Sequence, residues 1–487
     1  MIDITIYKRN KSNIYFTVLS ALFFLCLSVY AIYSISDPYL WYDEAGQFWI
    51  SKGLNHYSTP FSREGGIMDV IINNRYYNLD PGGFSIILHY WTFISNNSIF
   101  LRLLPAIFFM GCCLSIFYLG YKITSNKIFS LILASIPFFE PHIFNFCVEL
   151  RAYSMEMLGT ILGAIMIIKY KSNFTYNKLL LLSLVLSFFC TSRYGFVIVA
   201  AVYSLRILFM LYKGNSINKF ILKSLLFSLP EFITIMFVYW GEMQFQNAKA
   251  EPIGYSSYLN SSLRLFISPL SILFYINIWI VIYKYRKKKS IHEFYILSLL
   301  VSSLFFILSC LGVYPWDVNK TISVSLLLLI SCFIYFYQVI SKLNIRHINI
   351  IMSLGYILMI TVGITLGFFK RHNQFQFIYK EYVTLNITEY NTIFVDTHIN
   401  PTLRYLYEYG NLSDKNNIDG YPERFILQNG DIHSFNHLTK KKSVQPQDTI
   451  CDLYLMLRAY KEDNSFIKLD NYKIASKRIS QPNNVKF

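Results

Sequence analysis

Charged residues are scarce in this chain. Asp, Glu, Lys and Arg make up only 15% of its 487 residues, whereas about a quarter is usual in soluble proteins. Hydrophobic residues account for 54% of the chain and aromatic residues for 18%. This composition excludes an ordinary soluble globular protein. It predicts a helical membrane protein, because apolar runs of about twenty residues are long enough to cross about 30 Å of hydrocarbon.

The sequence also lacks the usual signatures of cofactor and metal sites. It contains no Gly-rich phosphate loop, which argues against a nucleotide-linked donor. Its 8 cysteines lie mostly in or beside apolar segments, where Cys behaves as a small hydrophobe, and none has the Cys/His spacing of a zinc site. An Asp-Glu pair can bind a divalent ion, but no further oxygen ligands can be placed beside it. We therefore expect no cofactor, and the sequence does not imply a metal.

Apolar segments recur from the N-terminus to about residue 370. We predict about eleven membrane spans. The first, near residues 14–36, is too long for the apolar part of a signal peptide, and no small-residue cleavage pattern follows it. The others are predicted near residues 99–121, 128–147, 152–169, 178–191, 196–213, 219–240, 263–283, 294–312, 320–340 and 347–369.

The positions of the cations predict the orientation of these spans. Lys8, Arg9 and Lys11 precede the first span, which places the N-terminus in the cytoplasm under the positive-inside rule. The later cationic clusters then fall on the same side, and the acids of the loops fall on the other. The net charge of +16 is explained by these loops facing an anionic leaflet, so it requires no nucleic-acid partner. We expect a multi-pass protein of the bacterial inner membrane.

The hydrophobic pattern changes at about residue 370. We therefore predict a membrane domain at 1–370 and a small α/β domain at 371–487, which follows an odd number of spans and lies on the periplasmic side. Within it, residues 392–396 and 449–456 are typical of buried strands, and residues 401–407 of a helix.

The first outer loop, from about 37 to 98, is long for a connection between spans, and long loops are often functional. It contains the adjacent acids Asp43 and Glu44, followed by a short predicted helix. Residues 85–95 form an apolar piece about half as long as a span, and we expect it to lie in the membrane interface.

The order of these motifs resembles that of the GT-C glycosyltransferases, polytopic enzymes that use polyprenyl-phosphate sugars. The resemblance is to the bacterial branch that includes protein O-mannosyltransferases and lipid A aminoarabinose transferases. It covers roughly the first third of the chain. The motifs are Tyr42-Asp43-Glu44-Ala45, Asp80-Pro81-Gly82-Gly83-Phe84, Leu101-Arg102-Leu103-Leu104-Pro105-Ala106 and Glu149-Leu150-Arg151-Ala152-Tyr153.

The chain departs from that family at two places, one in these motifs and one near the tenth predicted span. The family often has His-Pro-Pro where this chain has Asp80-Pro81-Gly82, and it often has an Arg-Tyr pair where the candidate here is Lys320. These departures leave the sugar and the acceptor undetermined.

The resemblance implies that Asp43 is the general base for the acceptor hydroxyl, and we expect Glu44 to orient the acceptor or to tune Asp43. The alternative is that both acids merely cap a helix beginning near Ala45, since acids favour helix N-termini.

Arg151 is the candidate for the donor phosphate, because a guanidinium can grip two phosphate oxygens and stays charged. We expect Glu149 to hold Arg151 and Tyr153 to line the sugar pocket. The alternative is a structural Glu-Arg pair that anchors a helix end.

Further candidates for the donor and substrate site are Arg193, Tyr194, Arg102, Lys320 and Asp80. A single interfacial Arg or Lys can instead be a snorkelling anchor. Two further acids, Glu156 and Glu231, fall inside predicted spans, where ionisable groups are expensive and frequently functional.

Together these features predict an all-α polytopic membrane protein with interfacial helices in the first outer loop and a C-terminal α/β domain. The expected activity is inverting transfer of a sugar from a polyprenyl-phosphate donor to a lipid or cell-envelope glycan acceptor among membrane lipids. The alternatives are a protein Ser/Thr acceptor, a lipid-linked saccharide flippase and a non-catalytic envelope scaffold.

Overall fold

The computed structural model describes residues 40–55, 62–78, 80–238, 265–288, 290–317, 321–343 and 400–409, five short strands and a few isolated positions. By its internal contacts the chain divides into two units. The bundle unit comprises Met1–Tyr33, Asn74–Phe84 and Arg102–Leu366, and the second unit comprises Ser34–Asn73, Ser85–Leu101 and Gly367–Phe487. The bundle unit ends at Leu366, close to the predicted boundary at residue 370, whereas most of the first loop groups with the C-terminal segment.

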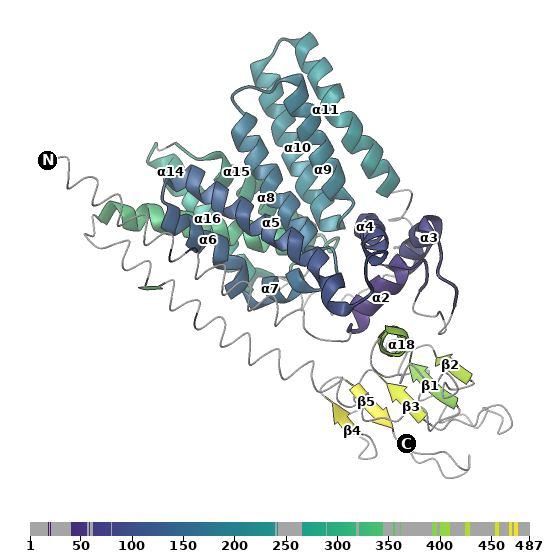
Figure 1. Ribbon diagram of the computed structural model, residues 1–487. Helices are drawn as coiled ribbons and strands as arrows, with labels where there is room; N and C mark the ends of the chain where they lie inside the picture. Colours follow the sequence, from purple (N-terminus) through teal and green to yellow (C-terminus); the bar gives the residue numbers. More distant parts are fainter. Residues whose placement is uncertain are drawn as a thin grey trace. The chain divides into compact units, whose positions relative to one another are not determined.

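The bundle unit is built from long helices (Figure 1). In chain order they are α5 (Ser98–Thr124, whose first turn belongs to the second unit), α6 (Lys127–Phe139), α7 (Pro141–Val148), α8 (Tyr153–Tyr170), α9 (Tyr176–Cys190), α10 (Tyr194–Gly214), α11 (Ile217–Val238), α14 (Pro269–Arg286), α15 (Glu293–Cys310), α16 (Ile322–Ile340) and the single turn η2 (Ser341–Leu343).

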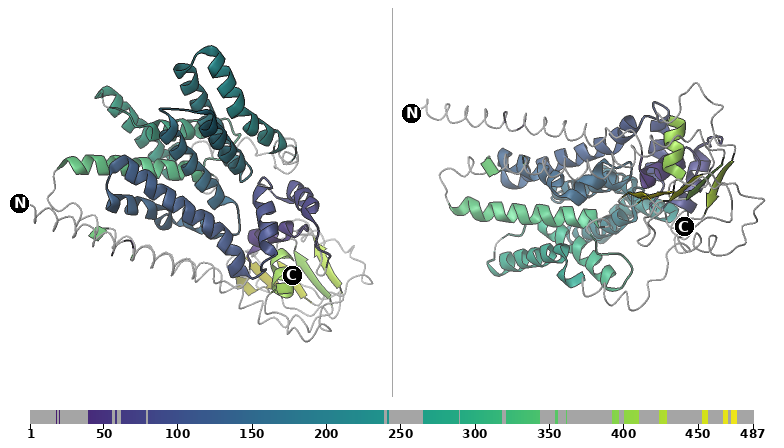
Figure 2. Two further views of the ribbon diagram at one scale, coloured as in Figure 1. Left: turned by 45° about the horizontal axis from the view of Figure 1, so that its top comes forward. Right: turned by 90° about the horizontal axis from the view of Figure 1, so that it is seen from below.

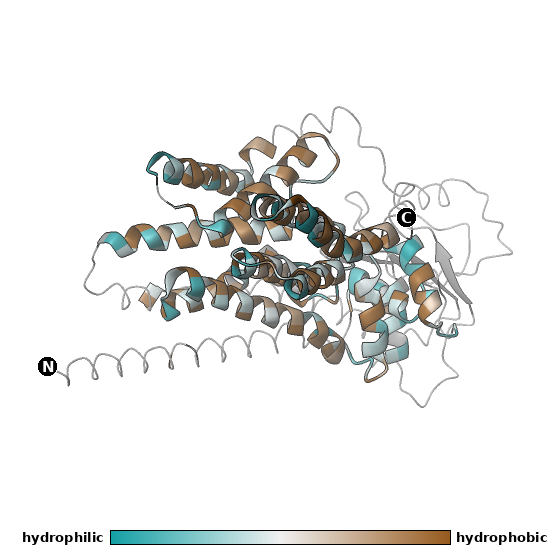
Figure 3. Ribbon diagram, turned by 90° about the horizontal axis from the view of Figure 1, so that it is seen from above, coloured by the Kyte–Doolittle hydropathy of each residue, from teal (hydrophilic) through white to brown (hydrophobic). Residues whose placement is uncertain are grey.

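Five of the described helices, α5, α10, α11, α15 and α16, are long and apolar enough to cross a membrane. Apolar residues dominate the long helices (Figure 3). Helices α6 and α9 are apolar but shorter. Helices α8 and α14 have 18 residues each, and polar residues such as Glu156 in α8 and Lys284 in α14 lower their mean hydropathy. The chain is thus a helical protein with several candidate membrane spans. The predicted spans at 14–36 and 347–369 lie almost wholly outside the described residues.

The single span predicted at residues 128–147 is wrong. Glu140 has extended backbone angles and ends α6, and Pro141 opens α7. Proline lacks an N–H and favours the first position of a helix, so the continuous apolar run hides a break. The Glu140 carboxylate then caps α7 by accepting a hydrogen bond from the Ile143 amide.

Two contacts establish the relative direction of helices α10 and α15. Arg206 in α10 pairs with Glu293, the first residue of α15. Near the start of α10, a Cβ on Gly195 would lie 3.0 Å from the hydroxyl of Tyr314, which follows α15. Helices α10 and α15 are therefore antiparallel. Helix α16 contacts α15, α14 and α8, and α9 packs against α11 (Figure 2).

The second unit contains short helices: α2 (Tyr42–Ser51), part of α3 (Ile67–Tyr77), most of α4 (Gly83–Thr92) and α18 (Asn400–Tyr409). Helix α4 overlaps the piece predicted to be interfacial, and α18 overlaps the helix predicted at 401–407. Helix α2 begins at Tyr42, three residues before its predicted start, so the acidic pair lies inside it.

Five strands form one mixed sheet in the order β2-β1-β3-β5-β4. They are β1 (Thr392–Asp396), β2 (Arg424–Gln428), β3 (Leu453–Met456), β4 (Ile467–Leu469) and β5 (Tyr472–Ala475). Strand β1 is parallel to β2 and β3, whereas β5 is antiparallel to β3 and β4. Strand β1 coincides with the strand predicted at 392–396, and β3 covers the second half of the segment predicted at 449–456.

Candidate functional site

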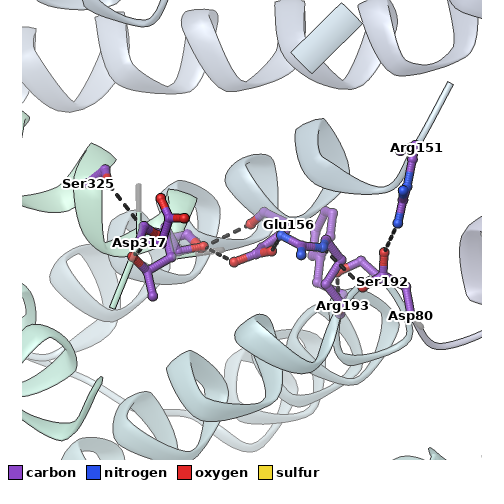
Figure 4. Close-up of polar contacts among 11 residues, drawn as sticks. Asp80, Arg151, Glu156, Ser192, Arg193, Asp317 and Ser325 are labelled. Carbon is purple, nitrogen blue, oxygen red and sulfur yellow. Dashed lines mark hydrogen bonds and ion pairs between the residues drawn. The ribbon is translucent and has the colours of Figure 1, made fainter. Parts of the chain in front are cut away.

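Four charged residues of the bundle unit form one ionic cluster, which we define as Asp80, Arg151, Glu156 and Arg193 (Figure 4). Arg193 donates from Nε to Asp80 Oδ1 at 3.1 Å and from Nη1 to Glu156 Oε2 at 2.9 Å. Arg151 donates from Nη2 to Asp80 Oδ2 at 3.3 Å. Asp80 therefore bridges two arginines, and Arg193 bridges two carboxylates.

The backbone around Asp80 is fixed from both sides. The Asn74 side-chain amide donates to the Asp80 carbonyl at 3.0 Å, and the Gly83 amide donates to the Thr191 carbonyl at 3.0 Å. A Cβ on Gly83 would lie 2.0 Å from Thr191 Oγ1, so this close approach requires glycine. The motif from Asp80 to Gly83 thereby docks on the turn that carries Arg193.

Arg193 is the residue immediately before α10 and has an extended backbone, with φ −146° and ψ 152°. Its guanidinium carbon lies 4.0 Å from the ring centre of Tyr153. Gly195 leaves room for the Glu156 carboxylate, because a Cβ at this position would lie 2.9 Å from Glu156 Oε1. The Arg151 guanidinium carbon lies 5.6 Å from the centre of the same Tyr153 ring, so one aromatic ring is close to both cations.

Hydroxyl groups complete the surroundings of Glu156, whose side chain is fully buried. Ser323 at the start of α16 donates to Glu156 Oε1 at 2.6 Å, and Thr160 donates to the Ser323 oxygen at 2.9 Å. The Tyr203 hydroxyl donates to the Thr160 carbonyl at 2.9 Å. Helices α8, α10 and α16 are joined by polar contacts at this end of the bundle.

The cluster has two acids and two arginines, so their formal charges cancel when all four are ionised. Burial alone would raise the pKa of Asp80, but Arg193 and Arg151 together lower that pKa below its ordinary value. The side chain of Arg193 is 6% exposed and that of Arg151 is 13% exposed. Arg151 is therefore the more accessible cation. Such an arrangement can hold an anion that competes with Asp80 for Arg151.

Asp43 and Glu44 occupy the first turn of α2 in the second unit. Glu44 is buried, and its Oε2 accepts a hydrogen bond from the Trp41 amide at 3.4 Å. The helix-cap alternative is thus supported for Glu44. Asp43 is half-buried.

The other predicted site residues lie in different surroundings. Arg102 is buried in α5, and Tyr194 is the first residue of α10. Lys320 lies outside the described residues. Arg151 pairs with the Asp80 carboxylate at 3.3 Å, and its backbone amide donates to the Glu149 carbonyl at 2.6 Å. The expected support of Arg151 by the Glu149 side chain stays a prediction.

Glu156 was not among the residues expected in the site, although its place within a predicted span marked it as a functional candidate. Glu231, the other such acid, lies in α11 and accepts a hydrogen bond from Ser204. Asp80, which was expected in the substrate site, compensates two arginines. Among the residues that the structure describes, no group of three or more His, Cys, Asp or Glu side chains could hold a metal ion.

Neither a protein-family model nor a curated protein matches the chain.

Proposed function

We propose that this chain is an inverting glycosyltransferase of the GT-C class. It would move a sugar from a polyprenyl-phosphate donor to a lipid or cell-envelope glycan at the outer face of a bacterial inner membrane. The observation that carries the proposal is the ionic cluster. Two arginines from separate sequence motifs share one carboxylate there, at 3.1 and 3.3 Å, beside membrane-type helices.

The chemistry of the donor matches such a cluster. A polyprenyl-phosphate sugar carries one negative charge on its phosphodiester, and the phosphate gains a second as the bond to the sugar breaks. Cations already held in a partly dry site stabilise this developing charge better than water does. Arg151 is the proposed phosphate ligand, because it is the more accessible arginine. Arg193 is the proposed anchor that keeps Asp80 in place.

Asp43 is the proposed general base. The acceptor hydroxyl attacks the anomeric carbon from the face opposite the phosphate, its proton passes to the Asp43 carboxylate, and the electrons of the broken bond stay on the phosphate oxygen. Inversion follows from this single displacement. Half-burial of Asp43 supports the assignment, whereas Glu44 binds the Trp41 amide and is proposed to orient its neighbour.

The proposal includes the finer architecture. In this proposal the chain has about eleven spans, a cytoplasmic N-terminus and a periplasmic α/β domain after residue 370. The acceptor class is a lipid or glycan, and a protein Ser/Thr acceptor is the alternative.

The direct test is sugar transfer in vesicles that contain the purified full chain and a polyprenyl-phosphate sugar. Asp43→Asn should lower the transfer rate at least about 100-fold, the usual contribution of a general base. Asp69→Asn is the matched control, because Asp69 is also an acid in the first turn of a short helix of the same unit. Full transfer by a well-folded Asp43→Asn chain would exclude Asp43 as the base. Transport of the donor without transfer would favour the flippase, and neither activity would favour a scaffold.

A second test identifies donor and acceptor. Mass spectrometry of envelope glycolipids from a strain without this protein should show the loss of one sugar from one lipid or glycan. An unchanged glycolipid profile would count against the lipid acceptor and favour the protein acceptor.

A further inference from the structure

A buried arginine joins the C-terminal segment to the helix that carries the acidic pair. Arg404 of α18 is 1% exposed. Its guanidinium carbon lies 3.9 Å from the ring centre of Trp49 in α2. The Trp49 indole N–H donates to the Pro401 carbonyl at 2.9 Å. Helix α18 therefore holds both the face and the edge of one indole ring.

Aromatic packing extends this contact along α2. The Phe48 ring meets Tyr405 and Tyr409 edge-to-face, with ring centres 5.2 and 5.5 Å apart. Phe48 and Trp49 have no exposed surface. Such pairs add about 0.5–1.5 kcal/mol each beyond their buried area.

Hydrogen bonds fix α18 against two loops of the same unit. The Tyr405 hydroxyl donates to the Asn96 carbonyl at 2.8 Å, and the Tyr409 hydroxyl donates to Glu64 at 2.9 Å. Glu64 also pairs at 3.1 Å with Lys52, the residue that ends α2. These contacts join α18, α2 and both loops into one network.

Arg404 itself is oriented by two partners. Its Nε donates to Glu408 one helical turn further on at 2.7 Å, and its Nη2 reaches the Ser62 carbonyl at 3.5 Å. A buried guanidinium with these bonds has few alternative positions. Its plane can therefore fix the plane of the Trp49 indole.

The other side of α2 is held by α4. Gln47 donates to Ser85 at 2.7 Å, and the His89 ring lies 2.7 Å from the Ser51 carbonyl. An isolated helix of 10 residues is marginal in water, so the position of α2 depends on these neighbours. Asp43 is about 9 Å along the helix axis from Trp49.

We infer that α18 is a positioning element for the acidic pair, with Arg404 as its principal positioning residue. The C-terminal segment would then set where Asp43 lies, acting through Trp49 and Phe48. The packing stands without the proposed activity, but its consequence for transfer rests on Asp43 being the base.

Hydrogen exchange of the full chain in nanodiscs tests the packing. Arg404→Ala should speed amide exchange in residues 42–51 about tenfold and leave α10 and α15 unchanged, because stability is local. Arg63→Ala is the matched control, an exposed arginine of the same unit that should change nothing. Tyr405→Phe removes only the hydroxyl bond to Asn96 and should give a smaller increase of about threefold in the same segment.

Kinetics test the consequence for transfer. Arg404→Ala should lower kcat with little change in the KM for the donor, and Arg404→Lys should restore part of the lost kcat. Exchange in 42–51 unchanged in both Arg404→Ala and Tyr405→Phe would overturn the inference. Faster exchange in a protein whose wild type transfers no sugar would keep the positioning role and reject the proposed function.

Discussion

Two arginines, one immediately before α10 and one within it, have their charges compensated in different ways. Arg206, about 20 Å further along the axis than Arg193, forms a closed two-bond pair with Glu293, at 2.6 and 3.1 Å. Arg193 instead shares its bonds between Asp80 and Glu156, and Asp80 shares its bonds with Arg151. A closed pair fixes two helices and leaves little to offer a ligand. A shared carboxylate can release one arginine and remain compensated by the other.

This difference predicts unequal responses to substitution at the two places. The Arg206–Glu293 pair should affect stability alone, whereas the ionic cluster should affect stability and transfer separately. Substitutions at Arg193, Arg206 and Arg151 and the pH dependence of Asp80 test it, in descending order of their expected effect on the free energy of unfolding.

The largest loss of stability is expected from Arg193→Ala. It leaves Asp80 and Glu156 buried without the cation between them, and breaking a buried pair costs about 3–5 kcal/mol. Unfolding in detergent, followed by intrinsic fluorescence, measures the loss. Arg193→Lys keeps the charge but cannot make both bonds, so it should recover only part of the stability. An Arg193→Ala chain as stable as wild type would show that the cluster does not hold these segments together.

Arg206→Gln should cost less, about 2 kcal/mol, the usual worth of hydrogen bonds to a charged group. The amide can keep one bond to Glu293 but not the charge. We expect the Arg206→Gln chain to transfer sugar at the wild-type rate, measured in the same vesicles. A fall in kcat larger than that of Arg151→Gln would remove the distinction between the two places.

The sequence predicted the fold and the site to different extents. Apolar run lengths located α8, α9, α10 and α11 to within about two residues, the usual uncertainty of helix ends. They missed the break at Glu140, because the run continues through it and only Pro141 marks it.

The sequence predicted the site residues that lie beside the ends of spans, because the order of the spans along the chain indicates their depth in the membrane. Arg151 and Arg193 were both predicted for the donor site, and each lies within two residues of the start of a helix, α8 or α10. The rotation of side chains about the helix axes cannot be read from the sequence, so the hydrogen bond that Ser323 donates to Glu156, 167 residues away, could not be predicted. The bond between Trp49 and Pro401, 352 residues apart, depends on packing in the same way.

Arg151→Gln is expected to cost about 1 kcal/mol or less in stability, because its side chain is partly accessible and Asp80 keeps Arg193. Transfer should nevertheless fall about 100-fold, as when a donor that stabilises developing charge is removed. Equal transfer by Arg151→Gln and wild type would reject the phosphate role. Parallel losses of stability and transfer would make Arg151 a structural anchor.

The smallest effect is expected from pH, through Asp80. Its pKa is lower in the folded chain than its ordinary value, so its ionised form stabilises the fold. That contribution is fully present above about pH 4, the ordinary pKa of Asp, and is lost as the pH falls through the folded value. The stability difference between wild type and Asp80→Asn should therefore be constant from neutral pH to about pH 5 and shrink below about pH 4. Arg151→Gln should shift the loss to higher pH, since one cation that lowers the pKa is gone, whereas Arg206→Gln should leave the profile unchanged. A difference that grows as the pH falls would mean that Asp80 is protonated in the folded chain and that the two arginines are compensated by Glu156 alone.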